Sequence, residues 1–348
     1  MQTLESFYFD YLSSNLSHED RNHGIMIFGD IICINFDAVY GHLRECTLRG
    51  VDQLLYLVHK NGKGKRFIFL SEDGAIIKHS GAFQFIINCV ECFNLNEDTC
   101  AVFCRENLCI PNVRVFNMNF VHYWVNGIWN TVKSAPLQQG NLEKKFAVWF
   151  NRGTFFRLQL MRHLFENYKN DSFISYQETG MVGEFSLNEY FEDDLNWANN
   201  NTPVVYDKLF ENRMYDFEAI VGANRKPYKH YFLEIVAEPN IIDNSWITEK
   251  TIKNLYLGKP FIMFSGPYSL KLLKENGFQT FNNWIDESYD EIINSYDRLE
   301  AIKKEIDRLA SKSYVELEDI QKQMLPVLEH NRQKFVEFIS PDSRIFTQ

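Results

Sequence analysis

The sequence predicts an α/β protein of two doubly wound domains that ends in helices, and three observations support this. First, 348 residues exceed the usual size of one domain and suffice for two hydrophobic cores. Second, residues 66–103 show the strand-helix-strand pattern of a βαβ unit. Third, strand and helix patterns alternate from 146 to 264, and the uninterrupted apolar character of its strands indicates a parallel sheet buried on both faces.

Residues 132–141 contain a proline and a glycine and are typical of a linker. We therefore place the first domain at 1–138 and the second at 139–348. The 30 phenylalanines support two well-packed cores and argue against disorder.

The first domain combines short strands with one clear helix. Its expected elements are a hairpin over 24–36 that turns at Gly29 and Asp30, a strand at 66–70, a loop at 71–74, a helix at 81–93 and a strand at 100–103. All seven cysteines lie between Cys33 and Cys109. Their odd number and apolar surroundings favour reduced core thiols over a zinc site.

The second domain restarts the alternation and then becomes helical. Its expected elements are strands at 146–150, 174–176, 231–237 and 261–264, helices at 155–167, 248–257 and 269–276, an exposed polar loop at 193–202, and helices over 288–338 with a break near 311–313.

The helix that begins at Thr248 has an unusual charge at its start. Thr248 is suited to cap the helix, and Gly258 followed by Pro260 ends it. A helix N-terminus offers unpaired N–H groups and the positive end of the helix dipole, and Lys250 adds a further positive charge there. This combination predicts that an anion binds at the helix start.

A second helix start also concentrates polar and cationic groups. Asn151 and Arg152 form the turn after the strand at 146–150, and Arg157 lies in the first turn of the following helix. Ordinary surface positions are the alternative interpretation for both arginines. Glu238 follows the next buried strand at its carboxyl end, where doubly wound sheets bind their ligands.

A family resemblance rests on three segments. Residues 248–250 (Thr-Glu-Lys) and 258–262 (Gly-Lys-Pro-Phe-Ile) resemble the nucleotide-sugar site of fucosyltransferase-type glycosyltransferases, which have two Rossmann-like domains facing a cleft, the GT-B architecture. Residues 277–281 and 286–290 resemble a signature common in viral and bacterial relatives of this family. The resemblance covers residues 144–300.

The resemblance implies a glycosyltransferase that moves a hexose or pentose from a nucleotide-diphosphate sugar to an acceptor hydroxyl. It implies that Glu249 holds the ribose, and that Lys250 and the segment after the strand at 146–150 contact the diphosphate. The residues expected at the donor site are Asn151, Arg152, Arg157, Glu238, Thr248, Glu249 and Lys250. Val236–Asn240 replaces the Phe-Glu-Asn that fucosyltransferases carry, so the identity of the sugar stays open.

The catalytic base is expected in the first, acceptor-side domain. Glu72 and Asp73 lie in a loop at the carboxyl end of a strand and are the first candidates, with Asp30, Asp37 and His79 as rivals. The sequence contains no Asp-x-Asp triplet, so we expect no metal and no cofactor besides the donor substrate. Inversion and retention both remain open, although the family favours inversion.

Composition indicates where the protein is expected in the cell and which class of acceptor it is expected to use. The sequence lacks an 18-residue apolar stretch and a basic region before an apolar run, so we expect a cytoplasmic protein without membrane span or signal peptide. The net charge of -10 disfavours nucleic acid, and we expect a glycan acceptor. The alternatives are a DNA-modifying glycosyltransferase that acts on a hydroxymethylated base, and a non-catalytic nucleotide-binding protein of the same fold.

Overall fold

The computed structural model divides the chain into two compact units. The N-terminal unit contains residues 1–126 and 344–348, and the C-terminal unit contains 127–343. The structure describes residues 25–36, 58–71, 82–104, 109–117, 140–150, 154–176, 192–202, 204, 226–238, 241 and 247–339. The linker predicted at 132–141 lies almost entirely outside these residues.

Within the described residues, the N-terminal unit contains a five-stranded sheet in the order β1-β2-β3-β4-β5. Its strands are β1 (Ile25–Phe28), β2 (Ile31–Asn35), β3 (Arg66–Ser71), β4 (Cys100–Cys104) and β5 (Arg114–Asn117). β1 and β2 form the predicted antiparallel hairpin, in which Gly29 takes the positive φ of 57° that the tight turn requires. β2 to β5 pair in parallel.

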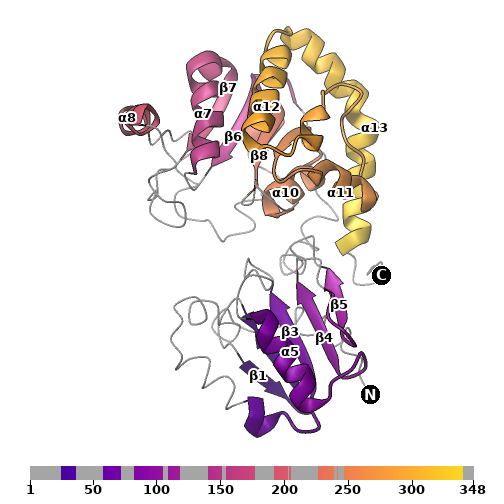
Figure 1. Cartoon of the computed structure of the whole chain (residues 1–348). Helices are drawn as coiled ribbons and strands as arrows, with labels where there is room; N and C mark the ends of the chain where they lie inside the picture. The colour runs from indigo at the N-terminus through magenta and orange to yellow at the C-terminus, as the bar shows by residue number, and fades with distance from the viewer. Residues whose placement is uncertain are drawn as a thin grey trace. The chain divides into compact units, whose positions relative to one another are not determined.

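Helix α5 (Ala82–Phe93) lies across one face of this sheet (Figure 1). Its Phe85 meets Phe69 edge to face, with ring centroids 6.4 Å apart. Cys89 is buried in the same core, and burial raises the pKa of its thiol to about 12. Cys92, one turn away, is exposed. The expectation of core cysteines is therefore confirmed for Cys33, Cys89, Cys100 and Cys104, which are buried, and wrong for Cys92 and Cys109, which are exposed.

The C-terminal unit contains a four-stranded parallel sheet, counted within the described residues, in the order β7-β6-β8-β9. Its strands are β6 (Lys144–Phe150), β7 (Ser172–Tyr176), β8 (Tyr231–Ala237) and β9 (Phe261–Phe264). The main helices are α7 (Phe155–Tyr168), α8 (Glu192–Asn201), α10 (Glu249–Leu257), α11 (Ser269–Glu275), α12 (Ser295–Ala310) and α13 (Tyr314–Ile339). The predicted α/β class is confirmed.

The predicted exposed loop at 193–202 is wrong, because this segment is helix α8. Its asparagines have weak intrinsic preference for a helix. Contacts with α7 compensate: Asp194 forms an ion pair with Arg162 at 2.9 Å, and the Trp197 ring meets Phe165 edge to face at 5.5 Å. Tertiary packing therefore decides the structure of this segment.

The two long C-terminal helices pack against different partners (Figure 1). α12 packs against α7 and β9, whereas α13 packs against α10, where the rings of Tyr256 and Phe335 lie 6.4 Å apart. The predicted break near 311–313 is confirmed as the connection between them. No helix in the described part of the chain is long and apolar enough to cross a membrane.

A buried polar cluster lies between β8 and α10. Glu234 accepts from Lys253 Nζ at 2.7 Å and from the Tyr231 hydroxyl at 2.8 Å. Lys259 Nζ donates to the Tyr231 carbonyl at 2.9 Å. Two buried lysines thus share the surroundings of Glu234.

Candidate functional site

The carboxyl ends of β6 and β8 mark the point where the C-terminal sheet changes direction. From β6 the chain passes through α7 to β7, and from β8 it passes through α10 to β9 on the other side. Because such crossovers are nearly always right-handed, the two helices cover opposite faces. Doubly wound sheets bind ligands in the crevice at this point. We call the ends of β6, β8 and β9, at Phe150, Ala237 and Phe264, the carboxyl edge.

Helix α10 begins at the carboxyl edge with the predicted cap. Thr248 is extended, and its hydroxyl accepts from the backbone N–H of Lys250 at 3.4 Å. The Lys250 ammonium folds back over the first turn and donates to the same hydroxyl at 3.1 Å. Glu249 is the first residue of the helix. A cation and the positive end of a helix dipole thus occupy one place, which favours a bound anion.

Glu238 anchors this helix start. Its carboxylate is fully buried and accepts from the backbone N–H of Thr248 at 3.1 Å, from the Thr248 hydroxyl at 2.5 Å and from the Thr251 hydroxyl at 2.6 Å. These contacts assign Glu238 a role in holding the first turn of α10. The donor contact that the sequence suggests for it stays a prediction.

Arg157 connects the two sides of the switch point. It lies in the first turn of α7, which Thr154 caps, and its side chain is buried. Its Nη2 donates to the carbonyl of Ala237, the last residue of β8, at 2.9 Å. The guanidinium of Arg157 therefore lies at the end of β8, and the residue that it contacts directly precedes Glu238. The alternative that Arg157 is an exposed surface arginine is wrong.

A third helix, α12, also starts at the carboxyl edge. Its Arg298 lies over the ring of Phe264 at 5.8 Å, and its Tyr296 packs on Phe156 at the start of α7. Further along, Asp307 accepts from the Tyr168 hydroxyl at 2.7 Å, near the end of α7. α7 and α12 therefore run in the same direction. Together with α10, they point three N-termini at this edge, each equivalent to roughly half a positive charge.

Arg298 is a functional candidate that the sequence pattern does not reveal. Burial lowers the pKa of its guanidinium, which donates to the carbonyls of Ile241, Ile292 and Ile293. Ile241 belongs to the connection between β8 and α10, so Arg298 joins that connection to the start of α12. In the sequence it is one of many charged residues on an amphipathic helix, and no local signal distinguishes it.

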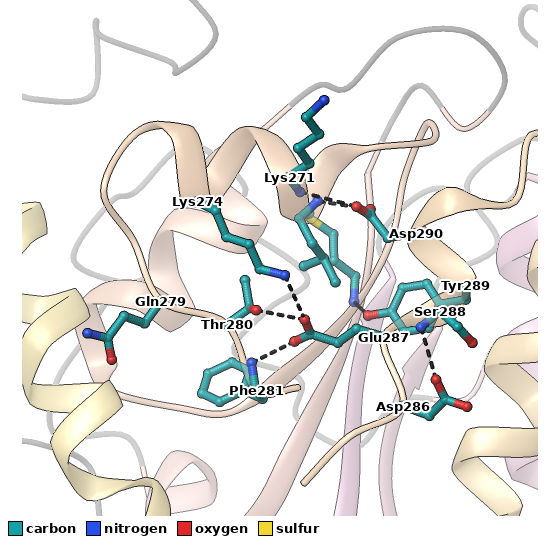
Figure 2. Close-up of polar contacts among 12 residues, drawn as sticks. Lys271, Lys274, Gln279, Thr280, Phe281, Asp286, Glu287, Ser288, Tyr289 and Asp290 are labelled. Atoms are coloured by element: carbon teal, nitrogen blue, oxygen red, sulfur yellow. Dashed lines mark hydrogen bonds and ion pairs between the residues drawn. The ribbon is translucent and has the colours of Figure 1, made fainter. Parts of the chain in front are cut away.

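The segments 277–281 and 286–290 contact each other and form a brace (Figure 2). Glu287 accepts from the Thr280 hydroxyl and the Phe281 N–H, both at 2.6 Å. Asp290 accepts from the backbone N–H of Leu270 at 2.9 Å and thus holds the start of α11. The acidic groups of this signature therefore satisfy neighbouring donors of the chain itself.

Asp30 is unsuited to be the catalytic base. It precedes β2 and pairs with Arg66 Nε, at the start of β3, at 2.8 Å. It therefore lies at the amino ends of these parallel strands, away from the end where ligands bind. The hydrogen bond from Arg66 also lowers the pKa of Asp30, which weakens it as a base.

The other sequence candidates lie outside the described residues. These are Glu72, Asp73, Asp37, His79, Asn151 and Arg152, and the side chain of Glu249 belongs with them. Their roles stay predictions. In the described part of the chain, no group of three or more His, Cys, Asp or Glu could hold a metal ion.

Comparisons with known proteins give one structural similarity. No family model and no curated protein matches the sequence. A solved structure of a UDP-forming α,α-trehalose-phosphate synthase from Burkholderia xenovorans matches over 91% of this chain and 74% of its own, with 11% identity and a TM-score of 0.43. At this identity and score, the similarity says nothing about individual residues of the carboxyl edge.

Proposed function

We propose that the protein is a GT-B glycosyltransferase that binds a nucleotide-diphosphate sugar at the carboxyl edge of its C-terminal sheet. The observation that supports this most is the contact of Arg157 with Ala237 at the end of β8, directly before Glu238, which holds the start of α10. Both segments were expected at the donor site on sequence grounds, and both begin helices at the carboxyl edge. Two α/β units with parallel sheets are consistent with the GT-B plan.

In the proposed reaction, the edge stabilises the departing nucleoside diphosphate. Bond breakage at the sugar leaves negative charge on the diphosphate, and preorganised positive groups lower the energy of that state. Lys250 and the N-termini of α7 and α10 would supply this charge, and Glu249 would hold the ribose. Glu72 or Asp73 would accept the proton of the acceptor hydroxyl, and no metal or other cofactor takes part.

We propose a glycan hydroxyl as the acceptor. Enzymes that act on duplex DNA normally present cationic surface, whereas this chain has a net charge of -10. Two of the four cations in its basic tract at 60–66 are engaged at the amino end of the first sheet, where Lys65 donates to the Gly29 carbonyl at 2.5 Å and Arg66 pairs with Asp30. Transfer to glycan extracts and to hydroxymethylcytosine DNA, compared at 50 to 200 mM salt, separates the two acceptors.

A panel of nucleoside diphosphates and their sugars tests the donor. A ligand at 100 times its Kd stabilises the folded state by about 2.7 kcal/mol, so the matching nucleotide should raise the melting temperature clearly. The same donor should then release its sugar in the presence of the protein. Failure of every nucleoside diphosphate to raise the melting temperature would contradict the proposal. Binding without sugar release would instead support the non-catalytic alternative.

A further inference from the structure

Tyr296 is an aromatic residue with an unusual exposure. It lies in the first turn of α12, and 52% of it is exposed. One side of its ring is nevertheless packed, because the ring centroids of Phe156 and Phe155 lie at 5.2 and 5.8 Å. Ile293, three residues earlier in the chain, is also exposed, at 62%. Tyr296 therefore presents an apolar surface that the described part of this unit does not cover.

Contacts through the core connect Tyr296 with the candidate donor site. The ring of Phe156 meets that of Phe264 edge to face at 5.5 Å. Phe264 ends β9, and its carbonyl accepts from the backbone N–H of Glu238 at 2.9 Å. Contacts therefore lead from Tyr296 through two phenylalanines to the residue that anchors the start of α10.

The Tyr296 ring, packed on one side by Phe155 and Phe156, lies on a helix start whose backbone is fixed. Asn294 caps α12 and accepts from the backbone N–H of Tyr296 at 2.9 Å. Arg298, two residues further along, fixes the same helix start to the preceding carbonyls and to Ile241. A preorganised ring loses little conformational entropy on binding, so stacking on it contributes more to affinity.

We propose that Tyr296, supported by Phe156, is the stacking surface for the base of the donor nucleotide. This inference rests on the proposed function and extends the diphosphate site by an aromatic subsite. Three helix N-termini favour the diphosphate, and the nucleotide base is the flat, apolar part of the same ligand. Because every base has a π face, the surface provides affinity for nucleotides and little selection among bases.

Calorimetry with two ligands tests this subsite. The ligands are the nucleoside diphosphate that stabilises the protein most and inorganic pyrophosphate, which lacks a base. Tyr296→Ala should lower the affinity for the nucleoside diphosphate by about 5- to 150-fold and leave the affinity for pyrophosphate unchanged. Tyr296→Phe should bind both ligands as the wild type does. Since the ring is half exposed, both variants should keep the fold, which circular dichroism checks.

The possible results separate this inference from the proposed function. Equal binding of the nucleoside diphosphate by wild type and Tyr296→Ala would overturn the subsite and leave the proposed function standing. An equal loss of affinity for both ligands in Tyr296→Ala would also overturn the subsite, because Tyr296 would then affect diphosphate binding or the fold. Absence of nucleotide binding by the wild type would overturn the proposed function and the subsite together.

Discussion

Burial has different consequences for the charged residues Glu238, Lys253 and Lys259 of the C-terminal unit. Glu238 is buried with three donors on its carboxylate, so its charge organises backbone and hydroxyl groups at the start of α10. Deeper in the same unit, Glu234 and Tyr228 overcome the effect of burial and raise the pKa of Lys253 to about 12. Burial lowers the pKa of Lys259 to about 7, and Glu234 offsets this effect only in part.

Lys259 makes stability depend on pH with a defined sign. Its amine has an ordinary pKa of 10.5 and releases its proton near pH 7 in the folded protein. Between these values the unfolded state binds more protons, so the free energy of unfolding rises with pH. From pH 7 to 9 this contribution amounts to about 2 kcal/mol.

Urea unfolding of wild type and Lys259→Met at pH 7, 8 and 9 measures this contribution. The variant lacks the titrating amine, so its stability relative to the wild type should fall by about 2 kcal/mol across the range. Taking the difference cancels the titration of cysteines and tyrosines that both proteins share. If the difference in the free energy of unfolding between the two proteins did not change with pH, the lowered pKa of Lys259 would be contradicted.

At the scale of elements, sequence reasoning succeeded where local signals and packing agree. Helix α10 has a threonine cap, and Gly258 ends it with a φ of 65°, so its bounds could be predicted closely. Helix α8 was missed because its stability comes from Arg162 and Phe165 on another helix, which composition does not reveal. The brace through Glu287 was also hidden, because its partners are defined only in the folded chain.

Arg298 provides a test of how the start of α12 is held. Lysine at this position keeps the charge but loses the planar fork that reaches several carbonyls. Arg298→Lys should therefore lower the free energy of unfolding by about 2 kcal/mol and increase hydrogen exchange around 292–298. Lys304→Arg is the control, because Lys304 lies on the same helix and its side chain is exposed. If Arg298→Lys kept the stability and the hydrogen exchange of the wild type, Arg298 would not hold the start of α12.

At the scale of the whole molecule, the two α/β units follow from strand and helix periodicity, and the site follows from topology. The sequence indicated which helix starts are cationic, but it could not show that β6 and β8 are neighbours, since strand order depends on long-range pairing. That pairing places Arg157 and the start of α10 at the same edge of the sheet. Turnover measurements test the expected catalytic loop. If Glu72 or Asp73 is the base, Glu72→Gln or Asp73→Asn should lower turnover and leave donor binding unchanged.

The most direct test of the donor site is the affinity of Lys250→Ala for the nucleoside diphosphate that stabilises the protein. A charge-assisted contact to phosphate contributes roughly 1.5 to 3 kcal/mol, so calorimetry should show binding weakened by about 10- to 150-fold. Lys322→Ala removes an exposed lysine from α13 and should bind like the wild type. An unchanged Kd in a folded Lys250→Ala protein would contradict a donor site at the start of α10.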